Sequence, residues 1–301
     1  KERTTMTTIT DPEVLSFIAQ SEAAYPPEMK TASIDKNRAF YAKMCASFEA
    51  PFPTGVTYDD ITIDTIPVRR YRRQNTPKAR LLYIHGGGFV LGDVDSHHGI
   101  CGDIADRTEV EVWALTYRLC PEHPYPAALN DCDAVWHAMG SDRPRLIAGD
   151  SAGATLSAAL THRFSRLGKP QPHAQILIYP TLGGDRSLPS YTQNANAPLL
   201  STADMDYYEG LYNAPANDPE GRPLSAAHYK GLPPTFITTA DMDPLRDDGA
   251  VYAQRLKAAG TPVIYRNEAQ LPHAHLRARH VCTRAKESFD AVISYINQQV
   301  D

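Results

Sequence analysis

The stretch from Leu146 to Ala154 most constrains the fold, because it joins an apolar strand to a helix through one very short turn. Its sequence, Leu-Ile-Ala-Gly-Asp-Ser-Ala-Gly-Ala, contains a Gly-x-Ser-x-Gly motif centred on Ser151. Apolar residues then recur every three or four positions from Ala152 to Leu167, which predicts a helix. We expect Ser151 to adopt a strained turn at a sheet edge, with Gly149 and Gly153 relieving collisions and the helix N-terminus facing its hydroxyl. Such a position is typical of a catalytic nucleophile.

The chain around this stretch alternates apolar strands with amphipathic helices. Such alternation predicts an α/β protein with a mostly parallel central sheet, helices on both faces, and an active site at the carboxyl ends of the strands. Two alternating segments, 56–63 and 67–73, predict an antiparallel pair at one sheet edge. The further strands are expected at 81–84, 110–117, 145–148, 175–179, 235–239 and 262–265, and the helices at 98–107, 126–139, 152–167, 245–259 and 281–298.

Composition bounds the function class. The 301 residues are 42% hydrophobic and 22% charged, as in globular proteins, and a net charge of -5 provides no basic face for nucleic acid. No apolar run is long enough to cross a bilayer, and residues 1–10 have no apolar core of a signal peptide. The five scattered cysteines form no C-x-x-C pair, which favours free thiols in a cytoplasmic protein without a zinc site.

Two segments are expected to form a cap over the sheet. Residues 1–52 are a helical arm with much aromatic surface, and residues 183–230 interrupt the alternation of strands and helices. Long insertions at the carboxyl edge of a sheet are commonly lids. We therefore predict a catalytic domain over 53–301 that carries the insertion, with the arm completing the cap.

Serine catalysis needs a base, an acid that orients the base, and donors for an oxyanion. The base should follow the last strand, where His273 stands and where His275 and His280 are competitors. The acid should follow the preceding strand, and three carboxylates are open there: Asp241, Asp243 and Asp247.

Asp243 also fits a structural role, because an Asp before a Pro commonly begins a helix. The donors are expected in the glycine run after strand 81–84, at Gly86, Gly87 and Gly88, together with the backbone N–H of Ala152.

These motifs resemble those of the hormone-sensitive-lipase-like branch (family IV) of the α/β-hydrolases. Members of this branch are bacterial carboxylesterases with an H-G-G-G loop, and the chain looks most like the acetyl esterases among them. The resemblance runs from about residue 79 to the C-terminus. It rests on His-Gly-Gly-Gly-Phe at 85–89, Leu-Gly-Asp at 91–93, Tyr-Arg-Leu-Cys-Pro-Glu-His-Pro-Tyr-Pro-Ala-Ala at 117–128, Gly-Asp-Ser-Ala-Gly at 149–153 and Asp-Pro-Leu-Arg-Asp at 243–247.

The resemblance implies a role for each matching residue. Ser151 is the nucleophile, Asp243 the acid, and His273, thirty residues further on, the base. The oxyanion hole is formed by Gly87, Gly88 and Ala152, with Gly86 as a further candidate, and His85 shapes that loop. The family's usual His-Gly-Phe is replaced by His-Ala-His at 273–275, which leaves the role of His275 open. A homodimer through the last strand and helix would fit the family.

The resulting prediction is a serine carboxylesterase that hydrolyses small-molecule esters with short acyl chains and needs no cofactor. We expect the protein to have no nucleic-acid partner and no stable association with a membrane. Two alternatives share the same fold: an amidase or arylformamidase that uses the same triad, and a small-ligand receptor of the gibberellin-receptor type, in which the catalytic histidine is replaced.

Overall fold

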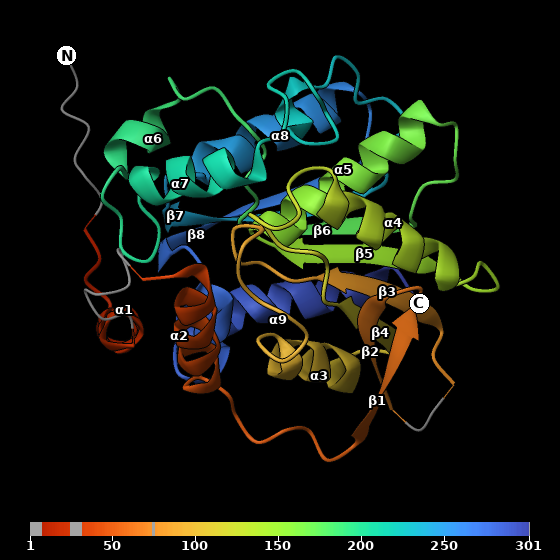
Figure 1. Cartoon of the computed structure of the whole chain (residues 1–301), viewed down its shortest axis with the longest axis horizontal. Helices are drawn as coiled ribbons and strands as arrows, with labels where there is room; N and C mark the ends of the chain where they lie inside the picture. Colours follow the sequence, from red (N-terminus) through yellow and green to blue (C-terminus); the bar gives the residue numbers. More distant parts are fainter. Residues whose placement is uncertain (1–7, 25–31, 74–75, 301) are drawn as a thin grey trace.

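A computed structural model describes residues 8–24, 32–73 and 76–300 of the chain. At its centre lies an eight-stranded sheet in the order β1-β2-β4-β3-β5-β6-β7-β8 (Figure 1). β1 pairs antiparallel with β2 and β2 with β4, whereas all further pairings are parallel. The strands are β1 (Val56–Ile63), β2 (Ile66–Arg73), β3 (Ala79–Ile84), β4 (Val110–Leu115), β5 (Arg145–Asp150), β6 (Ala174–Ile178), β7 (Thr235–Met242) and β8 (Val263–Pro272).

Helices cover both faces of the sheet (Figure 1). Leu81 and Tyr83 of β3 pack in the cluster that contains α3 and α9, while Leu82 and Ile84 pack in the cluster of α4 and α5. Because successive side chains of a strand point to opposite faces, this two-sided burial requires the unbroken apolar run in β3. The helices that form these layers are α3 (His98–Arg107), α4 (Ala127–Ala138), α5 (Ala152–Arg166), α8 (Arg246–Ala258) and α9 (Thr283–Gln298).

The remaining helices gather at one end of the molecule, on the left in Figure 1. They are α1 (Pro12–Ala23), α2 (Ile34–Ala46), α6 (Pro189–Gln193) and α7 (Thr202–Tyr212). The described residues also form the 3-10 helices η2 (Pro223–Ser225) and η3 (His275–His280). The tip of the predicted arm, residues 1–7, and its middle, residues 25–31, lie outside the described part of the chain. The division into a cap and a catalytic domain stays a prediction.

Several contacts fix these helices to the rest of the fold. Asp11 at the start of α1 accepts from Arg284 of α9 at 2.7 Å, and Arg38 of α2 donates to the backbone oxygen of Val90 at 3.0 Å. The ring of Tyr212 at the end of α7 stacks on Phe89, with centroids 3.7 Å apart. Helix α1 is therefore held against α9, whereas α2 and α7 are held against the loop that follows β3.

Two features differ from the sequence prediction. The last strand, expected over 262–265, continues to Pro272, because its polar residues lie on an edge strand where neither face has to be apolar. The short helix α6 was not predicted, because five residues hold too little periodicity to be recognised. All five cysteines are free and buried, as predicted.

Candidate active site

Ser151 lies between β5 and α5 in the strained conformation expected for it, with φ 53° and ψ -120°. Its N–H donates to the backbone oxygen of Ile178 at 2.9 Å, which fixes the turn to the next strand. A Cβ on Gly153 would overlap the backbone oxygen of Ile84, and one on Gly149 would overlap Gly153 itself. The two glycines thus relieve collisions with β3 and with each other.

Strand pairing brings the acid and the base together. Met242, the last residue of β7, pairs with Pro272, the last residue of β8, after a bulge in the register. Asp243 and His273 follow directly on these two residues. His273 Nδ1 lies 2.6 Å from Asp243 Oδ2, and His273 Nε2 lies 2.8 Å from Ser151 Oγ. The three side chains form one hydrogen-bonded chain.

Asp243 is fully buried and held by further donors. Its second carboxylate oxygen accepts the N–H of Leu245 at 2.9 Å, and its backbone oxygen accepts from Asn194 at 3.0 Å. The turn before α8 and the contact with His273 use different oxygens of the same carboxylate. The structural and the catalytic interpretations of this residue are therefore compatible.

The competing histidines lie elsewhere. His275 is buried; its Nδ1 lies 3.0 Å from the oxygen of Pro272 and its Nε2 lies 3.2 Å from Ser288 Oγ. Burial lowers the pKa of His275 to about 4, so the ring is neutral near pH 7. His280 instead contacts Asp103 on α3 at 2.7 Å.

The competing carboxylates also have other partners. Asp241 accepts from Asn267 at 3.2 Å, and Asp247 accepts the N–H of Ser190 at 2.8 Å. Both contacts tie neighbouring segments to β7 and α8. Of the three carboxylates left open by the sequence, the structure places Asp243 against His273.

The glycine run after β3 forms a loop beside Ser151. Gly87 and Gly88 have positive φ, 123° and 61°, which L side chains rarely adopt. Both residues line the cavity that contains Ser151. Ala152 is the first residue of α5, so its N–H has no carbonyl partner within the helix. Gly86 differs, since its N–H donates to Asp150 Oδ1 at 3.1 Å. The N–H of Gly86 is thus already engaged by Asp150, and its part in the oxyanion hole stays a prediction.

Asp150 was missed as a site residue in the sequence. It is buried and accepts from Tyr83 Oη at 2.9 Å as well as from Gly86, and its Oδ1 lies 3.2 Å from His97 Nε2. Burial by itself would raise the pKa of Asp150, but His97, Arg277 and the Tyr83 hydroxyl outweigh it and hold that pKa below its usual range. One ionised carboxylate thus links the nucleophile turn to the oxyanion loop. The only signal in the sequence was a carboxylate at the end of an apolar strand.

His85 shapes this loop, as the resemblance implies. Its Nδ1 lies 2.8 Å from the backbone oxygen of Gly86, and its ring stacks on Tyr117 at 4.2 Å. Burial lowers the pKa of His85 to about 4. A neutral ring stacked in this way supports the loop.

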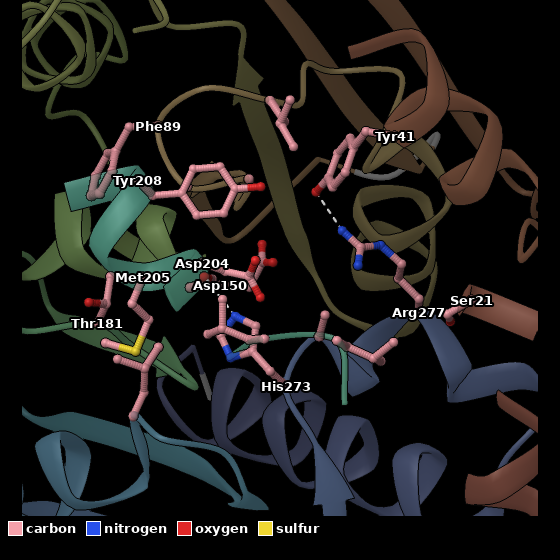
Figure 2. Close-up of a pocket in the computed structure, with 18 of the residues that line it drawn as sticks. Ser21, Tyr41, Phe89, Asp150, Thr181, Asp204, Met205, Tyr208, His273 and Arg277 are labelled. Carbon is pink, nitrogen blue, oxygen red and sulfur yellow. Dashed lines mark hydrogen bonds between the residues drawn. The ribbon is translucent and has the colours of Figure 1, made fainter. Parts of the chain in front are cut away.

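A cavity of about 380 Å³ opens over Ser151 and His273 (Figure 2). Its walls come from both parts of the predicted cap and from the sheet edge. Segments far apart in the sequence contribute to it: Ser21, Glu22, Tyr41 and Met44 from α1 and α2; Leu199, Leu200, Asp204, Met205, Tyr208 and Glu209 from the insertion; and Phe89, Leu91, Asp150, Thr181, Leu245, Ala274 and Arg277 from the remainder. The side chains are mixed in polarity, and the cavity can enclose a small organic molecule.

Within the described ranges, we find no group of three His, Cys, Asp or Glu side chains placed to hold a metal ion. No helix in the same ranges combines the length and apolar character needed to cross a membrane.

The chain is similar to known proteins both in sequence and in structure. Residues 81–277 match a family described as the alpha/beta hydrolase fold. "Esterase LipI" of Mycobacterium tuberculosis is 42% identical over 69% of this chain and 69% of the relative. "Ethyl acetate hydrolase" of Pseudomonas putida is 32% identical over 78% of this chain and 79% of the relative. A crystal structure of an esterase from the bacterial hormone-sensitive lipase family superposes with a TM-score of 0.87 at 25% identity, over 98% of this chain and 100% of the other.

Proposed function

The chain belongs to the alpha/beta hydrolase fold family, and from this premise we propose that it is a serine carboxylesterase acting through Ser151, His273 and Asp243. Its relatives are named esterases and carboxylesterases, and the chain is a carboxylic ester hydrolase. One observation carries the assignment of the triad: the imidazole of His273 lies within hydrogen-bond distance of both Ser151 Oγ and the buried carboxylate of Asp243.

The geometry supports a two-step acyl transfer. With Nδ1–H donating to Asp243, Nε2 of His273 takes the hydroxyl proton while Ser151 Oγ bonds to the ester carbonyl carbon. The carbonyl oxygen becomes an oxyanion that accepts from the N–H groups of Gly87, Gly88 and Ala152.

The second half of the cycle returns the enzyme to its starting state. The ester C–O bond breaks, and the alcohol leaves with the proton that His273 carries. Water then repeats these steps on the acyl-serine and releases the acid.

The cavity size supports short acyl groups. A space of about 380 Å³ must hold both halves of the ester. We expect hydrolysis rates of p-nitrophenyl esters to fall steadily from acetyl to dodecanoyl. A maximum at the long chains would reject the short-acyl assignment.

The nucleophile can be tested separately from chain length. An alkyl phosphonate ester traps an activated serine as a covalent adduct, which mass spectrometry of a proteolytic digest locates. We expect the adduct on Ser151 in the intact protein and no adduct in Ser151→Ala. An adduct on another serine would reject the assignment.

The two alternative functions, an amidase and a receptor, differ from an esterase in the leaving group or in the absence of turnover. An amidase with the same triad would cleave p-nitroacetanilide at a rate comparable to p-nitrophenyl acetate, whereas we expect the ester to be strongly preferred. A receptor would bind a small ligand without turnover. His273 occupies the position of the base, so we expect turnover.

Three further properties of the protein are its substrate class, its oligomeric state and its cellular location. The substrate is a small-molecule ester. A homodimer and a cytoplasmic location stay predictions, the second supported by five unpaired cysteines. Sedimentation of the purified chain tests the first.

A further inference from the structure

We propose that Arg277 binds a carboxylate carried by the substrate, so that the preferred esters are short and bear one negative charge. The inference rests on the proposed esterase function and names the substrate class of the same cavity. Arg277 lies on η3, four residues after His273, and lines the cavity that contains Ser151.

The cavity has walls of different polarity around His273. In the view of Figure 2, Arg277 and Tyr41 lie on one side of His273, and Met205 and Thr181 on the other. Met205 belongs to a small apolar cluster with Leu200 and Leu245, which also line the cavity; Tyr191 completes the cluster. An ester held at Ser151 can therefore place an apolar half against Met205 and a charged half toward Arg277.

Tyr41 holds the guanidinium in place. Arg277 Nη2 donates to Tyr41 Oη at 2.5 Å, and the Arg277 Cζ atom lies 4.9 Å from the centre of the Tyr41 ring. A guanidinium presents five N–H donors in a rigid plane that matches the two oxygens of a carboxylate. An arginine whose direction is already fixed loses less conformational entropy when it binds such a ligand.

Three of the four carboxylates that line the cavity contact other groups of the protein. Asp150 contacts His97, and Glu209 lies 3.2 Å from Arg186 and 3.6 Å from Arg222. Asp204 accepts from the N–H and hydroxyl of Ser201 at the start of α7. The fourth carboxylate, that of Glu22 on α1, is on an exposed side chain.

The positive charge of Arg277 acts inside the cavity. It contributes to lowering the pKa of Asp150, after burial and His97, and it opposes the rise that burial imposes on the pKa of Tyr208. An incoming carboxylate on the same wall would gain from this charge. Since the surroundings are partly shielded from water, the gain is larger than at an open surface.

The experiment compares pairs of esters that differ by one carboxylate. Ethyl hydrogen glutarate is paired with ethyl pentanoate, which tests the acyl side, and 4-acetoxybutanoate is paired with butyl acetate, which tests the alcohol side. For each pair, kcat/KM of the charged ester is divided by kcat/KM of the neutral ester. We expect this ratio to exceed one for at least one pair in the wild type.

Variants assign the preference to Arg277. In Arg277→Met the ratio should fall about 10- to 100-fold, as for loss of a hydrogen-bonded charged group. Arg277→Lys should keep part of it, because the charge remains and the planar fork is lost. Arg266→Met, at an exposed arginine on β8, is the matched control and should keep the wild-type ratio. Because the readout is a ratio within one preparation, a partly unfolded variant cannot imitate the effect.

Two results would overturn the inference. Ratios below one in the wild type for both pairs would show that the cavity repels carboxylates. An unchanged ratio in Arg277→Met would show that another group is responsible for the preference. Turnover of ethyl pentanoate or butyl acetate in either case would leave the esterase assignment standing, whereas inactivity on all four esters would reject both.

Discussion

At the scale of single residues, the sequence indicated the residues proposed to act on the ester and missed Asp150 and Arg277, which lie beside them. Ser151 is predictable because its motif must satisfy a tight strand-to-helix turn. His273 and Asp243 needed the family spacing, since three carboxylates and three histidines fitted the strand order. Asp150 and Arg277 could not be assigned, because their partners lie on segments remote in sequence, such as Tyr83 for one and Tyr41 for the other.

Asp150 provides a prediction at this scale. Asp150→Asn keeps an oxygen that can accept from Gly86 and Tyr83, whereas Asp150→Ala removes it. We expect kcat for p-nitrophenyl acetate to fall about 10²-fold or more in Asp150→Ala. Without its contact to Asp150 the oxyanion loop shifts and one N–H donor no longer reaches the oxyanion, and loss of one such donor lowers kcat by about this factor. Asp150→Asn should recover at least a tenth of the wild-type kcat.

A merely structural role for Asp150 would give a different pattern. Thermal unfolding followed by circular dichroism is the control, and both variants are compared below their melting temperatures. If Asp150→Asn and Asp150→Ala lost the same factor in kcat at the same folded fraction, Asp150 would not position the oxyanion loop through its hydrogen bonds.

At the scale of elements, the central strands and main helices followed from periodicity, and the sheet edge did not. Residues 81–84 of β3 and 146–148 of β5 are buried on both faces of the sheet, and all of them are apolar or aromatic. β8 lies at the edge, so its polar residues carried no strand signal beyond Tyr265. The bulge between β7 and β8 also escaped prediction, although it aligns Met242 with Pro272 and so places the acid beside the base.

Helix α7 provides a prediction at the scale of elements. Ser201 and Asp204 form a capping box at its start, in which the N–H of Asp204 donates to Ser201 Oγ at 3.2 Å. Ser201→Ala should cost about 1 kcal/mol of local stability. We expect faster amide hydrogen exchange over residues 202–212 and a higher KM, because α7 forms one wall of the cavity.

Ser165→Ala is the matched control for the cap variant. Ser165 is exposed near the end of α5, where alanine is a good helix former. Exchange over 202–212 should match the wild type in this variant. If Ser201→Ala also left that exchange unchanged, α7 would be held by packing alone.

At the scale of the whole molecule, alternation of strands and helices was enough to predict the sheet and its layers. It could not predict the cavity, because residues of α2, α7 and η3, which are remote from one another in the sequence, line it together. Burial across the molecule also has a consequence for pH. His85, His162 and His275 are buried, and burial lowers the pKa of each to about 4.

These histidines predict loss of stability in acid. Below pH 6.5 the unfolded chain binds protons that the folded chain does not take up until about pH 4, so the free energy of unfolding falls as the pH drops through this window. Each imidazole accounts for up to about 3 kcal/mol. Asp248 acts in the opposite direction, since burial raises its pKa to about 6, but three groups outweigh one.

Urea unfolding at pH 7 and pH 5 measures this effect. His162, which contacts Tyr252 away from the cavity, allows a clean test through His162→Gln. The free energy of unfolding should decrease from pH 7 to pH 5 by about 2 kcal/mol less in His162→Gln than in the wild type. An identical decrease in both proteins would show that His162 does not contribute.

Variant kinetics on p-nitrophenyl acetate test whether Ser151, His273 and Asp243 perform ester hydrolysis. We predict that Ser151→Ala and His273→Ala each lower kcat by at least about 10⁴-fold. His275→Ala should stay within about tenfold of the wild type, because His275 contacts Pro272 and Ser288 rather than Ser151. An inactive His275→Ala enzyme beside an active His273→Ala enzyme would assign the base to His275 and reject the proposed triad.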